Sequence, residues 1–188
     1  MTTRIHRLSP LATKSGHSRV TPIDEALVRQ KATDARANSR LREIHVFHSG
    51  DEDTLQRMLN ALQPGSYVTP HRHTPATKAE PLVLLQGSVG FVPFLDDGTP
   101  DEENFICLSR ERGVVGLDCR GDVWHTFFAL EPDSVVFEVK PGPFVPDAEK
   151  LFAAWAPGED DPGASAYLAR LEDRFRQRFG LGRRVWEA

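Results

Sequence analysis

The feature that most constrains the fold is a series of short apolar runs that fills the chain between residues 41 and 146. Turn-forming residues separate these runs, as in Gln63-Pro64-Gly65, Asp96-Asp97-Gly98 and Glu131-Pro132-Asp133. Short runs at near-regular spacing favour an antiparallel sandwich or barrel over a parallel sheet. The predicted strands cover residues 44–47, 54–62, 66–69, 82–85, 88–95, 105–108, 114–117, 123–129 and 135–139.

Segments of a different character flank this β region. Residues 1–20 are polar and unpatterned, which predicts a flexible lead. Residues 21–40 form a predicted helical segment that starts with Thr21 as N-cap and Pro22 at the first helical position. After the β region of residues 41–146, residues 147–188 form a predicted helical extension, with one or two turns at 147–154 and an apolar stripe at helical spacing over 164–179. The sequence therefore predicts one mainly β domain with helices at both ends.

Composition narrows the functional classes. A net charge of −4 and a pI near 6.0 give no general attraction to phosphate backbones, so nucleic acid is not an expected partner. There is no 18-residue apolar span and no secretory signal in residues 1–20, which predicts a cytoplasmic protein without a membrane segment. Cys107 and Cys119 are expected to be reduced, the first buried and the second more exposed. Exposed sheet edges and the N-terminal helix predict a homodimer.

Three histidines and one glutamate predict a metal site. Residues 65–87 follow the pattern G-x5-H-x-H-x6-E-x6-G, in which His71 and His73 share a face because side chains alternate along a strand. A turn then brings the chain back, so that Glu80 starts the next strand, and His125 lies in a distant β run. Neutral imidazole and carboxylate suit a divalent iron, manganese, nickel, copper or zinc ion. Four ligands of an octahedron leave two positions for a small molecule.

This arrangement resembles the cupin superfamily, whose first motif is G-x5-H-x-H-x3 or 4-E-x6-G. The chain matches that motif in every residue, with a longer spacer of six between His73 and Glu80. The second cupin motif, G-x5-P-x-G-x2-H-x3-N, is matched less well. Glycines precede His125 at altered spacing, the proline is missing, and Ala129 stands in place of the final asparagine.

A narrower resemblance is to the WbuC family of cupin-fold metalloproteins. It is carried by residues 56–73, 124–125, 137–143 and 152–157, and it spans roughly residues 36–157. The resemblance implies a single metal-bearing cupin jelly-roll β-barrel, often encoded with bacterial surface-polysaccharide genes. It implies no particular reaction or substrate.

Three further side chains are candidates for a role beside the metal. Lys78 could extend an ammonium group to a carboxylate or phosphate of a substrate, or it is a solvated loop lysine. Strand parity places Tyr67 on the face of His71, where it could donate a hydroxyl group, or it is a core tyrosine. The family resemblance suggests a role near the site for His48, which is otherwise a structural histidine. Glu138 and Lys140 share a strand face and are expected to form structural ion pairs, with each other or with Arg57.

Several functional hypotheses stay open at this point. The first is a metal-dependent enzyme that isomerises, epimerises or hydrolyses a small oxygen-rich, carbohydrate-like molecule. With Fe(II) the same site could serve a dioxygenase. The second is a ligand-binding or regulatory protein without turnover, and the third is a metal that only stabilises the fold.

Overall fold

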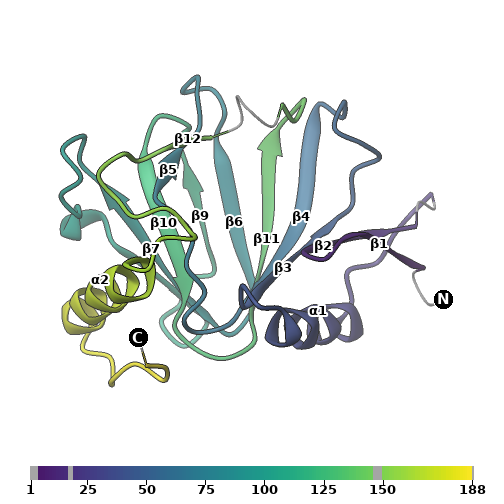
Figure 1. Cartoon of the computed structure of the whole chain (residues 1–188). Helices are drawn as coiled ribbons and strands as arrows, with labels where there is room; N and C mark the ends of the chain where they lie inside the picture. Colours follow the sequence, from purple (N-terminus) through teal and green to yellow (C-terminus); the bar gives the residue numbers. More distant parts are fainter. Residues whose placement is uncertain (1–3, 17–18, 146–149, 188) are drawn as a thin grey trace.

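The computed structural model describes residues 4–16, 19–145 and 150–187. Figure 1 shows two sheets with one helix against each. The elements in the N-terminal half are β1 (Ile5–Ser9), β2 (Ala12–Ser15), α1 (Glu25–Ala37), β3 (Arg42–Val46), β4 (Leu55–Leu62), β5 (His71–Arg72), β6 (Glu80–Gln86) and β7 (Ser88–Phe94). These are followed by a 3-10 turn (Glu102–Asn104), β8 (Ile106–Ser109), β9 (Gly116–Cys119), β10 (Trp124–Ala129), β11 (Ser134–Pro141), β12 (Leu151–Phe152) and α2 (Ala164–Phe179). Neither α helix in these ranges is long and apolar enough to cross a membrane.

The strands form two separate sheets. One has seven strands in the order β1-β2-β3-β4-β11-β6-β9, and the other has five in the order β12-β5-β10-β7-β8. The predicted closed barrel is therefore wrong, because no ladder joins the sheets within the described ranges. Closure would need long paired edges, whereas β5 and β12 pair over two residues each and β8 and β9 have four residues each. The fold is a mainly β sandwich.

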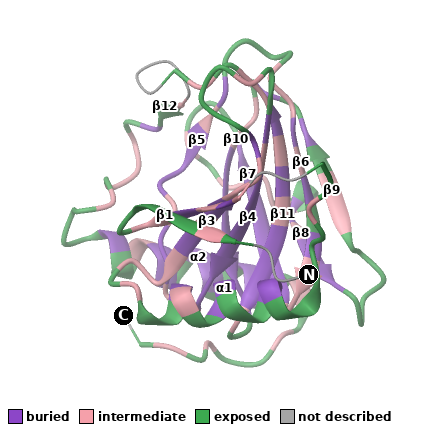
Figure 2. Ribbon diagram, turned by 90° about the vertical axis from the view of Figure 1, so that its right-hand side faces the viewer, coloured by how far each residue is buried: buried purple, intermediate pink, exposed green. Residues whose placement is uncertain are grey.

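Alternation along the strands separates an inner from an outer face. On β11, Val136 belongs to the apolar cluster between the sheets, and Glu138 and Lys140 follow it on the same face. Val135 and Phe137 point the other way and pack with α1. Buried residues accordingly concentrate on the strands in Figure 2, while the outer side of α1 is exposed. This alternation of side chains along the strand places polar groups in the space between the sheets.

The helix α1 covers the outer face of the seven-stranded sheet. Leu27, Ala32 and Ala35 bury its apolar side against β3, β4 and β11. The helix begins at Glu25, later than predicted, because the carboxylate of Asp24 accepts a hydrogen bond from the backbone N of Leu27 at 2.9 Å. Asp24 is therefore the N-cap, the role expected of Thr21.

The helix α2 covers the outer face of the five-stranded sheet. It spans Ala164–Phe179, as its apolar spacing predicts, and ends at Gly180 with a left-handed φ of 63°. Phe175 is completely buried and stacks on Phe105, the residue directly before β8, at a centroid distance of 5.4 Å. The aromatic stripe of this helix is thus a packing surface.

Two terminal segments differ from the prediction. Within the lead expected to be flexible, residues 5–15 form the β1–β2 hairpin, and β2 pairs with β3 in parallel. In the segment expected to form helical turns, residues 147–149 lie outside the described ranges, and residues 151–152 form β12 against β5. Both segments extend sheets because their backbones pair with edges that are far away in the sequence.

Candidate metal centre

The four predicted ligands meet at one point between the sheets. One ligand atom from each of His71, His73, Glu80 and His125 lies within 4.8 Å of the others. His71 on β5 is directly opposite His125 on β10, while Glu80 begins β6 of the other sheet. All four residues are at most 1% exposed. The site thus combines ligands from both sheets in a dry environment.

Backbone carbonyl groups orient two of the imidazoles. His71 Nδ1 lies 2.9 Å from the carbonyl of Thr69, and His125 Nδ1 lies 2.9 Å from the carbonyl of Val123. A proton on each Nδ1 is donated to these carbonyls, which leaves Nε2 directed at the cluster. This is the support that metal-binding histidines need.

The cluster passes a test of fit to a cation. His71 Nε2 and Glu80 Oε1 are buried and have no hydrogen-bond partner among the described residues. Leaving a buried polar atom unpaired costs about 1–3 kcal/mol, more for a charged group. A divalent ion bound to both atoms would remove this cost, and three imidazoles with one carboxylate are a suitable donor set.

Charge in the cluster is balanced by close contacts. Burial would raise the pKa of Glu80, but hydrogen bonds with His125 and His73 outweigh it and lower this pKa well below its usual range. Burial would lower the pKa of His125, but hydrogen bonds with Cys119 and Glu80 outweigh it and raise this pKa to about 10. His125 Nε2 and Glu80 Oε2 are 2.9 Å apart and share this proton. A cation bound to both atoms would therefore displace it.

The last glycine of the motif has a steric role. Gly87 has a φ of 75°, and a Cβ there would lie 2.5 Å from Ser134 Oγ and 2.8 Å from Ser134 Cα. Both the left-handed backbone and the close approach require glycine. The tight turn it allows connects β6, which carries Glu80, to β7 of the opposite sheet.

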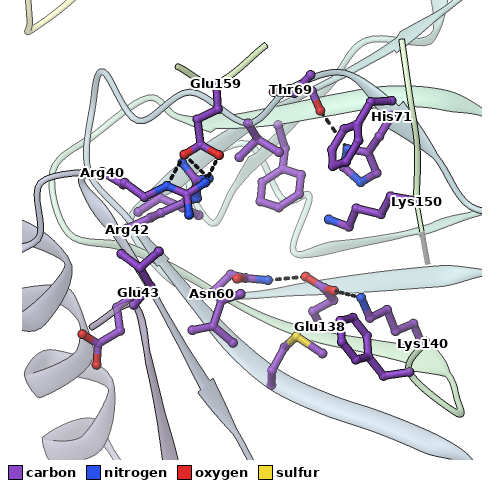
Figure 3. Close-up of a pocket in the computed structure, with 18 residues that line it drawn as sticks. Arg40, Arg42, Glu43, Asn60, Thr69, His71, Glu138, Lys140, Lys150 and Glu159 are labelled. Carbon is purple, nitrogen blue, oxygen red and sulfur yellow. Dashed lines mark hydrogen bonds and ion pairs between the residues drawn. The ribbon is translucent and has the colours of Figure 1, made fainter. Parts of the chain in front are cut away.

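A cavity of about 290 Å³ opens beside the cluster and is bordered by His71. Figure 3 shows the polar side chains that line it, which come from strands of both sheets and from the segments that flank β3, β5 and β12. The polar residues that line it include Asn60, Thr69, Glu138, Lys140 and Lys150, and the apolar ones include Met58, Val68, Phe127, Phe144 and Phe152. Of the four clustered ligands, His71 is the one that borders this space.

Glu138 is a functional candidate that sequence reasoning assigned to a structural ion pair. Its carboxyl group accepts a hydrogen bond from the amide of Asn60 and lies 3.8 Å from Lys140 Nζ. Burial, reinforced by the negative charge of Glu80, raises the pKa of Glu138 to about 8. The predicted pair exists, but it faces the cavity and holds a carboxyl group able to exchange a proton near neutral pH.

The three candidates named beside the metal lie outside this cavity. Tyr67 packs with Tyr167 and donates its hydroxyl group to the carbonyl of Pro157 at 2.7 Å. His48 Nδ1 lies 3.1 Å from the backbone N and O of Arg57. Lys78 lies in the loop between β5 and β6, and its side chain is not among the described residues that line the cavity. The parity argument for Tyr67 fails because β5 begins only at His71.

Cys119 differs from its predicted exposure. It is 6% exposed and pairs with Glu80 across β9 and β6. Its Sγ lies 3.8 Å from His125 Nδ1, so the residue forms part of the wall behind the cluster. Cys107 is buried as predicted, and both are free thiols.

A family model for a domain of unknown function, DUF6016, matches residues 23–106. The match includes His71, His73 and Glu80 but ends before His125. No curated protein matches the chain.

Several solved structures are similar to this chain. KdgF from Halomonas sp. is 20% identical, with a TM-score of 0.41, and the alignment covers 56% of this chain and 82% of that one. The oxalate decarboxylase from Bacillus subtilis at pH 4.6 is 16% identical with a TM-score of 0.42, covering 70% of this chain and 29% of that one. The capsular polysaccharide assembling protein CapF from Staphylococcus aureus is 18% identical with a TM-score of 0.46, covering 59% and 29%.

These three neighbours are cupin-fold proteins. The chain spans less than a third of the oxalate decarboxylase and CapF chains. All three TM-scores are below 0.5, and the assignment of the site rests on the residues of this chain. The narrower resemblance to the WbuC family stays a prediction.

Proposed function

We propose that this chain is a cupin-type metalloprotein that binds a divalent transition metal through His71, His73, Glu80 and His125. The observation that carries the proposal is the convergence of these four buried ligand atoms within 4.8 Å. The unpartnered His71 Nε2 and Glu80 Oε1 support it. A metal held by three neutral imidazoles and one carboxylate keeps a net positive charge, with which it polarises the oxygens of a ligand.

We further propose that the cavity holds a small oxygen-rich molecule. Its volume of about 290 Å³ lies just below the ~300–1,000 Å³ typical of small-molecule sites, which suits one sugar ring or a small hydroxy acid. Apolar side chains such as Phe127 and Phe144 line the cavity together with polar groups. The setting in surface-polysaccharide metabolism, the homodimer and the cytoplasmic location stay predictions from the sequence.

Glu138 favours an enzyme over a protein that only binds. Burial raises the pKa of this carboxyl group, which favours a protonated form that can give a proton to a ligand. Asn60 and Lys140 hold it at the cavity wall, where it can give a proton to a bound ligand or take one from it. Isomerisation and epimerisation are the reactions that this group suits best. An Fe(II) dioxygenase is the alternative that the donor set also allows.

Metal analysis tests the proposal. Protein purified without chelator should contain a stoichiometric transition metal by mass spectrometry, and Glu80→Gln and His73→Ala should lose it. His45→Gln is the matched control, because His45 is equally buried but lies outside the cluster. A folded wild-type chain with no bound metal, or equal metal loss in the control, would reject the site.

A second measurement separates turnover from binding. Glu138→Gln should keep the metal content of the wild type but lose proton exchange between solvent deuterium and a bound carbohydrate-like substrate. Oxygen uptake by iron-loaded protein would instead identify a dioxygenase. Tight ligand binding without exchange or oxygen uptake would identify a ligand-binding protein.

A further inference from the structure

A row of side chains crosses the five-stranded sheet and ends at its edge. Phe152 on β12 is directly opposite His71 on β5, and His71 is directly opposite His125 on β10. Residues opposite each other in antiparallel neighbours lie on the same face of a sheet. Phe152 therefore extends the row that carries two of the proposed metal ligands, and its side chain lies on their face.

The Phe152 ring borders the cavity next to these ligands. Its centre lies 6.2 Å from the centre of the His71 imidazole, and the two planes are tilted by 60°. Lys150 and Phe152 both line the cavity, whereas Leu151 between them does not, as alternation along an extended chain requires. Phe152 is thus part of the cavity wall beside the cluster.

The same ring is open to solvent. Phe152 is 59% exposed, and among the described residues it is the only exposed Phe, Tyr or Trp. Its backbone is held in place, because β12 pairs with β5 and Ala153 N donates to the carbonyl of Pro70 at 2.9 Å. An uncovered aromatic ring on a fixed strand, beside a cavity, is a surface that a bound molecule can cover.

We propose that Phe152 is a stacking platform for the apolar face of a sugar ring. The inference rests on the proposed function, since the same sugar would direct its hydroxyl groups to the metal beside His71. It also narrows the proposed ligand class. A cyclic sugar presents a C–H face that fits an aromatic ring, whereas an open-chain polyol or hydroxy acid has no such face.

The rest of the lining suits a sugar better than an aromatic molecule. Asn60, Thr69 and Glu138 line the same space and can exchange hydrogen bonds with hydroxyl groups. An aromatic molecule without hydroxyl groups would remove these polar side chains from water and offer them no hydrogen bond, which is costly. A second copy of the chain fits less well, because Phe152 lines a concave space of about 290 Å³.

The size of the expected effect follows from the exposure of the ring. Covering the exposed 59% of a Phe side chain corresponds to roughly a tenfold gain in affinity. Removal of the ring should therefore weaken the binding of a cyclic sugar by about this factor. An open-chain polyol should lose little, because it does not cover the ring.

Calorimetric binding to zinc-reconstituted protein tests the inference with probes that differ in ring closure. The cyclic probes are methyl β-D-galactopyranoside and methyl β-D-glucopyranoside, and their open-chain counterparts are galactitol and glucitol. We expect at least one cyclic probe to bind about tenfold more tightly than its counterpart. Phe152→Ala should reduce this preference to near unity, whereas Phe152→Tyr should retain it, with zinc content unchanged in both.

Leu151→Ala is the matched control. Leu151 is the neighbouring apolar residue and is 46% exposed, but it does not line the cavity, so its removal should leave the preference unchanged. Saturation-transfer NMR adds a readout of the contact itself. Irradiation of the aromatic protons should mark the hydrogens on one face of the sugar ring most strongly, and this pattern should weaken in Phe152→Ala.

Three outcomes would overturn the inference. The first is that open-chain polyols bind as tightly as the cyclic probes, or that no member of the panel binds. The second is a cyclic preference that survives Phe152→Ala. The third is a change of oligomeric state in Phe152→Ala, seen by sedimentation, while sugar binding stays the same, which would assign the ring to a contact with a second copy of the chain.

Zinc content separates failure of this inference from failure of the proposed function. A chain that holds zinc but shows no preference for cyclic probes refutes the stacking platform alone. A chain that holds no zinc yet prefers cyclic probes through Phe152 refutes the metal site and supports the platform.

Discussion

The buried cluster around Lys31 predicts a large loss of stability when its charge is removed. Lys31 on α1 is 1% exposed, and its Nζ lies 3.1 Å from Glu43 Oε1 on β3, 3.1 Å from Thr13 Oγ1 on β2 and 2.5 Å from Asp34 Oδ2. Lys31→Met keeps the length of the side chain but removes the ammonium group. The buried carboxylate of Glu43 is then left with Thr13 and with Arg7, whose Nη1 is 3.0 Å away.

The expected loss follows from this burial. Breaking a buried ion pair by removing one partner costs about 3–5 kcal/mol, because the other charge stays in the interior. Arg7 is 52% exposed at its side chain and compensates part of the Glu43 charge, so we expect the lower end, about 3 kcal/mol. The double variant Lys31→Met/Glu43→Met removes both charges and should regain most of this loss.

Urea denaturation followed by tryptophan fluorescence measures both effects as changes in the midpoint at constant slope. Arg29→Met on the same helix is the control, because its ion pair with Glu25 is exposed and should contribute less than about 0.5 kcal/mol. A loss below about 1 kcal/mol for Lys31→Met would show that the cluster is solvated and that the β1–β2 hairpin does not pack there. A double variant as unstable as the single one would refute the pairing of Lys31 with Glu43.

Three further predictions concern other parts of the fold. Burial and the charge of Lys31 lower the pKa of His45 from 6.5 to about 4, so the folded chain binds fewer protons than the unfolded chain and loses stability as pH falls from 6.5 toward 4. The loss amounts to about 3 kcal/mol, and urea midpoints of His45→Gln should lack this part of the acid dependence. Gly87→Ala, which forces a Cβ against Ser134, should cost about 2 kcal/mol or more in the same assay, and a neutral effect would contradict the left-handed turn. Phe175→Ala should cost about 3–5 kcal/mol by opening the α2 interface, and a loss within 1 kcal/mol, measured by thermal unfolding, would mean that α2 does not dock on the sheet.

Local patterns predicted the elements that depend on local interactions. The apolar residues of α2 recur at helical spacing and Gly180 follows them, so its range Ala164–Phe179 could be read directly. The start of α1 was less predictable, because Thr21-Pro22 has the composition of a helix start and Asp24 competes with it. Only the hydrogen bond from Leu27 to Asp24 decides between them.

The β1–β2 hairpin could not be predicted because its signal is neither local nor apolar. Thr13 and Ser15 on β2 are buried by hydrogen bonds to the two ring nitrogens of His45, each 2.8 Å long. Alternating polar residues of this kind look like solvent-exposed chain until their partner on β3 is known. The partner lies 30 or more residues away, which no short sequence window includes.

The candidate site likewise contains residues that local sequence patterns predicted and residues that they did not. The spacing of His71, His73 and Glu80 indicated that they converge, because a strand, a turn and a second strand bring them together. Lys150 gave no such signal, since it lies outside the motif in an irregular segment. The role of Glu138 depends on which sheet face looks into the cavity, and strand parity alone left that open.

The position of Glu80 makes the site depend on the register of the whole sandwich. Its β6 neighbours Leu82 and Leu84 are buried in the core between the sheets, whereas Val83 is 45% exposed. A slip of one residue would turn Val83 inward and Glu80 outward, because side chains alternate along a strand. The apolar core therefore selects the register that brings this carboxylate to the histidines of the other sheet. Burial of Leu82 and Leu84 thus compensates the cost of placing an ionised group between two sheets, where a cation can use it.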